Sequence, residues 1–231
     1  MIYFNGKTSD DLGVFVENCP SRPVPVRKYE KVSIPGRNGD IIYDEDAFEN
    51  VQQSYDIYIS AERKKLHNAA RAVAQWLCVP GYRRLEDSYD PYVFRRAAYK
   101  GGTEIENILN EYGRATITFD CCPQRFLKIG EYSYELENGQ KLVNPTGFAA
   151  LPVLTVTCSN GGVLTVGEDE ITIDALTGMV IIDSEEMECY DLEESLNEYV
   201  SGPFPKLTGE TQISWTGGIT SVSIQPRWFE V

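Results

Sequence analysis

The chain has 231 residues, of which 42% are hydrophobic, and it carries a formal net charge of −14. This composition excludes an intrinsically disordered chain. It also lacks a run of about 18 apolar residues, so no membrane-spanning helix is expected. The first residues lack the basic segment and long apolar run of a secretory signal. The length suits one large domain or two modest ones.

The charge is distributed unevenly along the chain. Residues 1–130 contain 18 Lys and Arg and 18 Asp and Glu, whereas residues 131–231 contain 3 and 17. The first part is therefore neutral, and the second part carries the whole net negative charge. We expect the acidic part to repel DNA, RNA and anionic membranes. The sequence therefore predicts no specific nucleic-acid partner and no membrane insertion.

The first sixty residues read as short strands separated by turns. Residues 12–16 predict a strand, and the prolines of residues 20–25 predict an extended segment. The stretch from Pro35 to Asp40 predicts a turn between two strands, because its Asn-Gly pair favours positive φ. Tyr55, Ile57 and Ile59 alternate with less apolar residues, which predicts a strand with one buried face.

A single long helix is predicted from Ser60 to Leu77. Ser60 is the expected N-cap, with the negative charge of Glu62 in the first turn. Pro80 and Gly81 end the helix, because proline cannot donate to its hydrogen-bond ladder. One apolar stripe follows helical spacing: Leu66, Ala69, Ala70, Val73 and Leu77. A lone amphipathic helix must pack on a sheet, so we expect it to close the core of the first domain.

Residues 83–87, 92–99 and 114–120 predict three more strands, which make the first half an α+β domain with one helix on an antiparallel sheet. From residue 130 to residue 147 the chain becomes polar and rich in turn residues, which is typical of a domain boundary. We therefore expect one domain over residues 1–130 and a second over residues 131–231.

The second half contains no helical pattern. Turns are expected at Asn160-Gly161-Gly162, at Thr177-Gly178 and at Gly217-Gly218. Seven short strands predict an antiparallel β-sandwich: residues 152–158, 163–166, 170–173, 178–183, 188–191, 211–215 and 221–224. Trp215 shares a strand face with Ile213, so we expect it in the core and expect no sugar binding through it. The position of Trp228 is less defined, because Pro226 interrupts its strand pattern.

Local motifs predict no chemistry. The six cysteines form no Cys-x-x-Cys pair and the chain has one histidine, so a zinc site is poorly supported. With no export signal, we expect reduced thiols. Neither a nucleophile motif nor a glycine-rich phosphate loop occurs, and the acidic stretch 183–194 lacks the spacing of a calcium loop. No catalytic residue, metal ligand or cofactor is predicted.

Several short stretches together resemble the distal tail protein (Dit) family of long-tailed bacteriophages, and the resemblance covers nearly the whole chain. Each stretch is a turn or a strand edge, and their order and spacing carry the resemblance. They are Pro35 to Asp40, Ile117 to Pro123, Asn144-Pro145, Gly178 to Glu185, Phe204 to Leu207, Ile213 to Trp215, and Pro226 to Trp228. The doubled Cys121-Cys122 departs from the family pattern.

The resemblance implies a structural protein of the virion tail tip, made in the bacterial host cytoplasm, and no enzyme. The N-terminal domains would form a homo-hexameric ring that joins the tail tube to the baseplate or tail tip used in host adsorption. A galectin-like sandwich would lie outside the ring. Expected partners are the tail tube protein, a tail-tip or tail fibre protein, the tape-measure protein and a receptor-binding protein. The candidate assembly-interface residues are Pro35, Gly36, Arg37, Asn38, Gly39 and Asp40.

Two other classes of function stay open at this point. A carbohydrate-binding module or lectin would suit a β-sandwich with many aromatic residues. A hydrolase could use a pair of the scattered carboxylates. Native mass separates these alternatives from the ring, because only the ring requires six copies.

Overall fold

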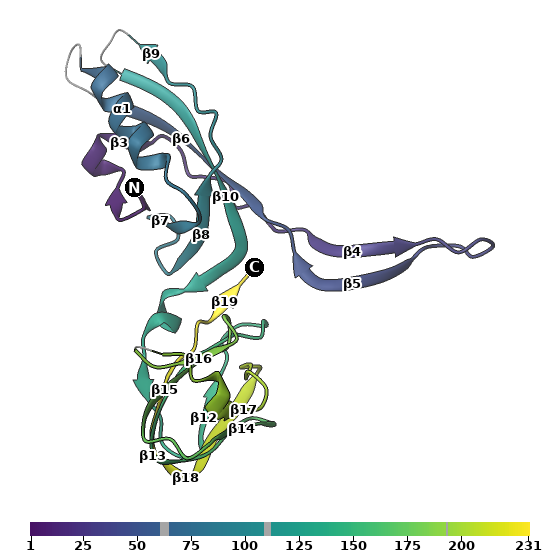
Figure 1. Cartoon of the computed structure of the whole chain (residues 1–231). Helices are drawn as coiled ribbons and strands as arrows, with labels where there is room; N and C mark the ends of the chain where they lie inside the picture. The colour runs from purple at the N-terminus through teal and green to yellow at the C-terminus, as the bar shows by residue number, and fades with distance from the viewer. Residues whose placement is uncertain (61–64, 109–111, 193) are drawn as a thin grey trace. The chain divides into compact units, whose positions relative to one another are not determined.

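The computed structural model describes all residues except 61–64, 109–111 and 193. The chain divides into two compact units, Met1–Arg125 together with Val231, and Phe126–Glu230 (Figure 1). The break between the units therefore follows Arg125, near the end of the strand that spans Tyr112–Leu127. The boundary expected from the sequence follows residue 130, five residues later. Among the described helices, none is long and apolar enough to cross a membrane.

In the described part of the first unit, a curled antiparallel sheet carries one α-helix (Figure 1), so the predicted combination is confirmed. Its strands run in the order β2-β1-β7-β8-β10-β6-β3, and β9 pairs with the start of β10. A separate two-stranded sheet is made by β4 and β5. The elements are β1 (Ile2–Phe4), β2 (Lys7–Thr8), the 3-10 turn η1 (Asp10–Leu12), β3 (Val14–Val16), β4 (Arg27–Val32), β5 (Ile41–Phe48), β6 (Val51–Ser60), α1 (Leu66–Leu77), β7 (Arg83–Asp87), β8 (Val93–Tyr99), β9 (Glu106–Ile108) and β10 (Tyr112–Leu127).

The core of this unit follows the alternation of its two central strands. Tyr55, Ile57 and Ile59 of β6 are fully buried, as the sequence predicts. Ile117 and Phe119 of β10 are buried on the same face, because Ile117 lies opposite Tyr55 in the antiparallel register. That register stays regular from residue 112 to residue 121, so the doubled cysteine does not disturb it.

Helix α1 covers this core. Leu66, Val73 and Leu77 are buried as predicted, and Trp76, which the predicted stripe omitted, is buried as well. The indole Nε1 of Trp76 donates a hydrogen bond of 2.8 Å to the carbonyl of Phe4. This bond ties the end of the helix to the first strand and satisfies the polar atom of a buried tryptophan.

The predicted start of the helix is wrong. Ser60 is the last residue of β6, where it pairs with Tyr112, and its backbone N–H donates to the carbonyl of Gly13 at 2.8 Å. The strand therefore continues through the expected N-cap, and the helix begins at Leu66 with Lys65 as N-cap residue. The expected first-turn charge of Glu62 lies outside the described residues.

The second unit is one antiparallel sheet without a helix longer than a 3-10 turn among its described residues. Its central path is β11-β18-β13-β14-β17, with β12 paired to β18 and β15 paired to β13 and β16. The elements are η2 (Lys128–Glu131), β11 (Tyr134–Glu135), β12 (Gln140–Val143), β13 (Val153–Val166), β14 (Asp169–Ile173), β15 (Gly178–Asp183), β16 (Glu188–Tyr190), η3 (Asn197–Tyr199), β17 (Val200–Ser201), β18 (Glu210–Gln225) and β19 (Phe229–Glu230).

Two of the predicted turns are wrong, because two pairs of predicted strands are single long strands. Residues 152–158 and 163–166 fall in β13, and residues 211–215 and 221–224 fall in β18. These two strands pair along their length, with irregular register between Thr157 and Gly162. One edge of β13 pairs with β15 before the irregularity and with β14 after it, so a single sheet bends there.

Glycine permits this bend. A Cβ atom on Gly162 (φ 151°) would lie 2.4 Å from the carbonyl oxygen of Thr216, and one on Gly217 would lie 2.8 Å from the Cα of Gly162. The glycine pairs therefore mark a close approach between two paired strands rather than loops. A glycine pair in a loop and a glycine pair inside a strand look the same in the local sequence.

The two tryptophans of this unit differ in burial. Trp228 is only 6% exposed and belongs to the core, whereas Trp215 is half-buried at the edge of that core. The expectation that Trp215 is fully buried is therefore wrong. Strand alternation assigned its face correctly, because it lies opposite the fully buried Leu164 and packs against the core, but part of its side chain stays exposed.

Candidate assembly surface

Strands β4 and β5 form a hairpin outside the large sheet, here called the arm (Figure 1). Val32 pairs with Ile41 at its outer end, and Tyr29 pairs with Asp44 nearer its base. Every residue of β4 and the first six residues of β5 are exposed. Exposure on both faces of a strand pair means that neither face packs on the body of the unit.

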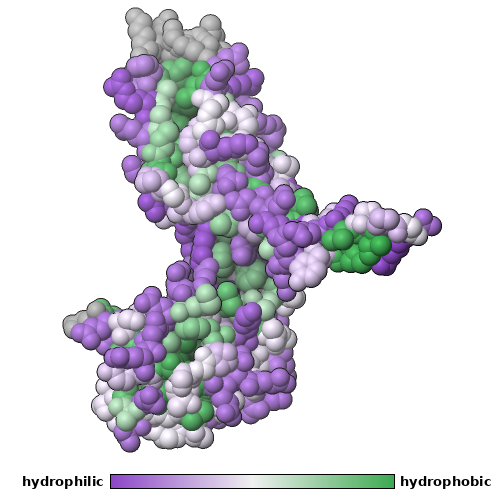
Figure 2. Space-filling view, turned by 45° about the vertical axis from the view of Figure 1, so that its right-hand side comes forward, coloured by the Kyte–Doolittle hydropathy of each residue, from purple (hydrophilic) through white to green (hydrophobic). Residues whose placement is uncertain are grey.

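The arm carries large apolar side chains despite this exposure. Ile42 and Tyr43 are 64% and 68% exposed and point to opposite faces, because neighbouring residues of a strand alternate. Figure 2 shows hydrophobic residues gathered on the visible face of the arm. The exposed apolar residues of the arm and the segments that flank its strands are Val24, Val26, Tyr29, Val32, Ile34, Ile41, Ile42 and Tyr43. Contiguous apolar exposure of this kind is typical of a protein-protein contact.

Polar contacts hold the base of the arm. The guanidinium of Arg27 pairs with Asp44 and, at 2.8 Å, with Asp46, and it lies over the ring of Phe48 at 5.4 Å. The backbone N–H of Asp46 and the guanidinium of Arg27 hold the pKa of Asp44 below its ordinary value. These contacts surround the irregular register between Arg27 and Tyr29, so they set the twist of the arm where it begins.

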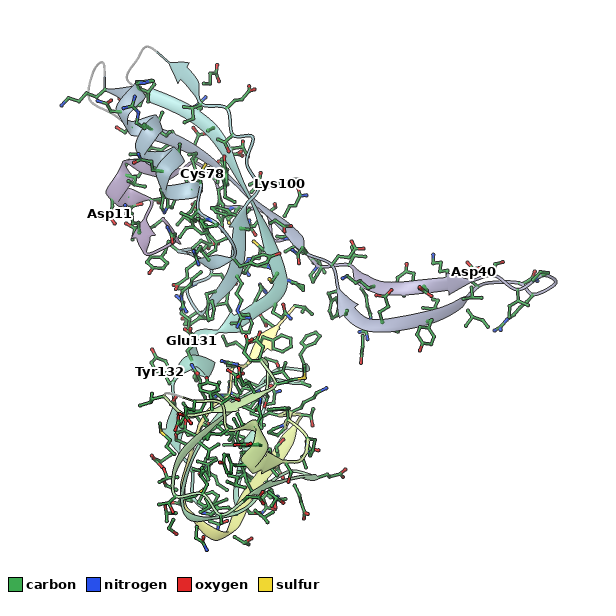
Figure 3. All side chains as sticks on the ribbon, viewed as in Figure 1. Asp11, Asp40, Cys78, Lys100, Glu131 and Tyr132 are labelled. Carbon is green, nitrogen blue, oxygen red and sulfur yellow. The ribbon has the colours of Figure 1, made fainter. Side chains whose placement is uncertain are left out.

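The predicted turn at the tip of the arm is confirmed. β4 ends at Val32 and β5 begins at Ile41, and the backbone N–H of Arg37 donates to the carbonyl of Ile34 at 3.1 Å. Gly36 and Gly39 both have positive φ. All six candidate assembly residues, Pro35, Gly36, Arg37, Asn38, Gly39 and Asp40, are exposed. Figure 3 shows Asp40 near the outer end of the arm.

A second feature of the same unit is a carboxylate-lined groove of about 590 Å³ on the polar face of β6 and β10. Arg114 is held there by Glu17 at 2.8 Å, and the hydroxyl of Thr116 donates to Asp56 at 2.7 Å. The remaining carboxylates of the groove belong to Glu104 and Glu106. This surface suits a cationic or hydrogen-bonding partner and differs in kind from the apolar arm.

The residues considered for chemistry lie apart from one another. His67 is exposed on α1, with its Nε2 3.3 Å from Arg71. Cys121 is buried in β10, and burial raises the pKa of its thiol to about 12. Within the described part of the chain, no group of three or more His, Cys, Asp or Glu side chains has an arrangement that could hold a metal ion.

Comparisons with known proteins agree with this architecture. Residues 7–121 match the family described as the phage tail protein RIFT-related domain. Seven chains of known structure match significantly. One is the crystal structure of Dit (gp 19.1) of phage SPP1, described as a paradigm of hub adsorption apparatus in Gram-positive infecting phages. It is 14% identical, with a TM-score of 0.78 and coverage of 97% of each chain.

No protein of curated function matches the chain significantly. The family match places a phage tail domain on the first unit, and the structural match extends the likeness over the second. Residues 7–121 are therefore a phage tail protein RIFT-related domain, and the whole chain has the fold of the distal tail protein Dit.

Proposed function

We propose that this protein is the subunit of a homo-hexameric ring at the virion tail tip, and that the ring joins the tail tube to the baseplate or tail tip used in host adsorption. The phage tail domain and the Dit-like fold support a role in the tail. The description of SPP1 Dit as a hub supports the position at the tip.

The exposed arm is the observation that carries the proposal. A two-stranded hairpin is marginally stable in water without further packing, and this one exposes apolar side chains on both faces. A closed ring requires a heterologous interface, in which two different patches of each subunit meet. The arm, including its tip from Pro35 to Asp40, is one such patch, and its occupant is a second copy of the chain.

The two parts of the chain take different roles in this proposal. The neutral residues 1–130 form the ring, because mixed charge allows paired contacts between subunits. The acidic residues 131–231 form a galectin-like domain outside it, where like charge keeps the surface solvated. The tail tube and tape-measure proteins contact one side of the ring. A tail-tip or fibre protein and a receptor-binding protein contact the other.

The test is native mass spectrometry of the full chain and of two variants. We expect hexamers at high concentration for the natural sequence, and loss of hexamers for the double variant Ile42→Asp/Tyr43→Asp. Lys28→Asp is the matched control, because it places a carboxylate on the same exposed hairpin without removing apolar area. A monomer at every concentration, together with no ring in assembled particles, would refute the ring. Hexamers of the double variant would refute the role of the arm.

A further inference from the structure

A small polar cavity of about 40 Å³ lies in the first unit, behind the segment that leads into the arm. The segment from Pro20 to Arg22 closes one side, where the carbonyl of Ser21 accepts a hydrogen bond of 2.9 Å from the Gln53 side chain. Strands β6, β7, β8 and β10 supply the other walls. The cavity is large enough for one water-sized or chloride-sized particle.

Arg95 of β8 brings an unsatisfied positive group to this cavity. Its Nη1 atom is buried and has no hydrogen-bond partner among the described residues. Burial lowers the pKa of the Arg95 guanidinium, because a charged group loses its hydration there. A buried guanidinium nitrogen without an acceptor is costly, since proteins rarely leave such donors unpaired.

Asp87 also lines the cavity, and both of its carboxylate oxygens already accept hydrogen bonds from other groups. One accepts the hydroxyl of Tyr55 at 2.8 Å. The other accepts the backbone N–H groups of Tyr89 and Asp90 at 2.8 and 3.0 Å. Asp87 therefore fixes the turn after β7 and holds Tyr55, and it makes no hydrogen bond to Arg95.

The other carboxylates that line the cavity interact with arginines other than Arg95. Asp90 is shared between Arg125 at 3.4 Å and Arg22 at 3.6 Å, and both distances are long for a charged hydrogen bond. Glu86 also lines the cavity, but its carboxylate pairs with Arg84, which lies outside it. Arg22, Arg95 and Arg125 all line the cavity, and no hydrogen bond joins the Nη1 atom of Arg95 to any of the three carboxylates there.

We propose that this cavity is a binding site for one small monovalent anion, chloride or a carboxylate of formate size, held by Arg95 with Arg22 and Arg125. The anion satisfies the buried Nη1 donor. It also links the segment before the arm to β8 and β10, because Arg22 belongs to that segment. The proposal does not depend on ring formation.

The first experiment follows thermal unfolding of the full chain in sodium chloride, sodium formate and sodium gluconate at equal ionic strength. Gluconate is too large for the cavity and serves as the reference salt. We expect a saturable rise of the melting temperature in chloride and formate, as for any ligand that binds the folded state. The same dependence in all three salts would overturn the proposal and assign the cavity to water.

Variants locate the site. Arg95→Gln should raise the chloride concentration at half-saturation by about tenfold or more, as expected for loss of one charged contact. Arg83→Gln is the control, because Arg83 is an exposed arginine of the neighbouring strand β7. If Arg95→Gln does not fold, Arg22→Gln replaces it, since that side chain is 61% exposed. Unchanged half-saturation in the folded variant would refute the site.

A crystal soaked in bromide gives an independent readout. Anomalous scattering should place one bromide within hydrogen-bond distance of Arg95 Nη1, and this peak should be absent from the Arg95→Gln or Arg22→Gln variant. Anomalous peaks only at surface positions would overturn the proposal.

Discussion

The protein contains two long antiparallel strand pairs with opposite surroundings. In β13 and β18, one face is buried, and Leu154, Val156 and Val222 have no exposed surface. In β4 and β5, nearly every residue is exposed on both faces. The backbone pairing is of the same kind in both. Backbone pairing alone therefore does not decide whether a strand pair stabilises the monomer. The pair contributes when other side chains of the chain pack on one of its faces.

This comparison separates two uses of apolar side chains. Burial within the second unit stabilises the fold by about 25 cal/mol for each Å² removed from water. The arm retains its apolar area in the monomer, where it contributes little, and can bury it only against another molecule. Substitutions in the two regions should therefore affect different measurements.

The largest expected effect is in the core beside the β13–β18 pair. Trp228→Ala removes a nearly fully buried indole and should cost about 3–5 kcal/mol of unfolding free energy. Trp215→Ala should cost clearly less, because that side chain is only half-buried. Chemical denaturation followed by fluorescence and circular dichroism measures both. Equal losses for the two variants would contradict the burial difference.

A smaller effect is expected from the ion pair beside this core. Arg227 donates to both carboxylate oxygens of Asp183 at 2.7 and 2.8 Å, and the Asp183 side chain is 4% exposed. Burial alone would raise the pKa of Asp183. The guanidinium of Arg227 and the backbone N–H groups of Glu185 and Glu186 outweigh it, and the pKa is lowered.

Because the folded pKa of Asp183 lies below its unfolded value of about 3.9, its contribution is present above that pH and is lost as the pH falls through the folded pKa. Asp183→Asn should cost about 1.5–3 kcal/mol at neutral pH and should flatten the acid-induced loss of stability. Unfolding measured between neutral and acidic pH tests this. Asp169→Asn, at the first residue of β14, is the control. A loss that is independent of pH would contradict the role of the ion pair.

The smallest effect on stability is expected in the arm. Ile42→Asp/Tyr43→Asp should change the unfolding free energy of the monomer by less than about 0.5 kcal/mol, as for exposed sites elsewhere. The measurement is thermal unfolding at a concentration where the chain is monomeric. A loss comparable with that of Trp228→Ala would show that the arm packs on its own chain, and the comparison between the two strand pairs would fail.

Patterns that depend on near neighbours were predictable. The alternation of β6, the apolar stripe of α1 and the turn between β4 and β5 all appear where the sequence placed them. Each follows from local geometry, because a period of two or of 3.6 residues and a positive φ are properties of a short segment. The family resemblance extended these local features to a phage tail protein.

Features that depend on a distant partner were not predictable. Gly162 and Gly217 looked like turn residues, and only the pairing of β13 with β18 shows that they allow two backbones to approach closely. Ser60 looked like a helix cap until its pairing with Tyr112 extended the strand. The relative burial of Trp215 and Trp228 depended on the distant residues that pack on each side chain, which no strand pattern contains.

By itself, the sequence determined the strand-rich class, the single helix, the hairpin turn and the separation of neutral and acidic halves, because these depend on composition and local periodicity. Only the tertiary structure decided that the apolar arm is exposed on both faces, and that Arg22, Arg95 and Arg125 meet at one cavity. The physical reason is that exposure and convergence depend on contacts between residues far apart in the chain, which folding brings together.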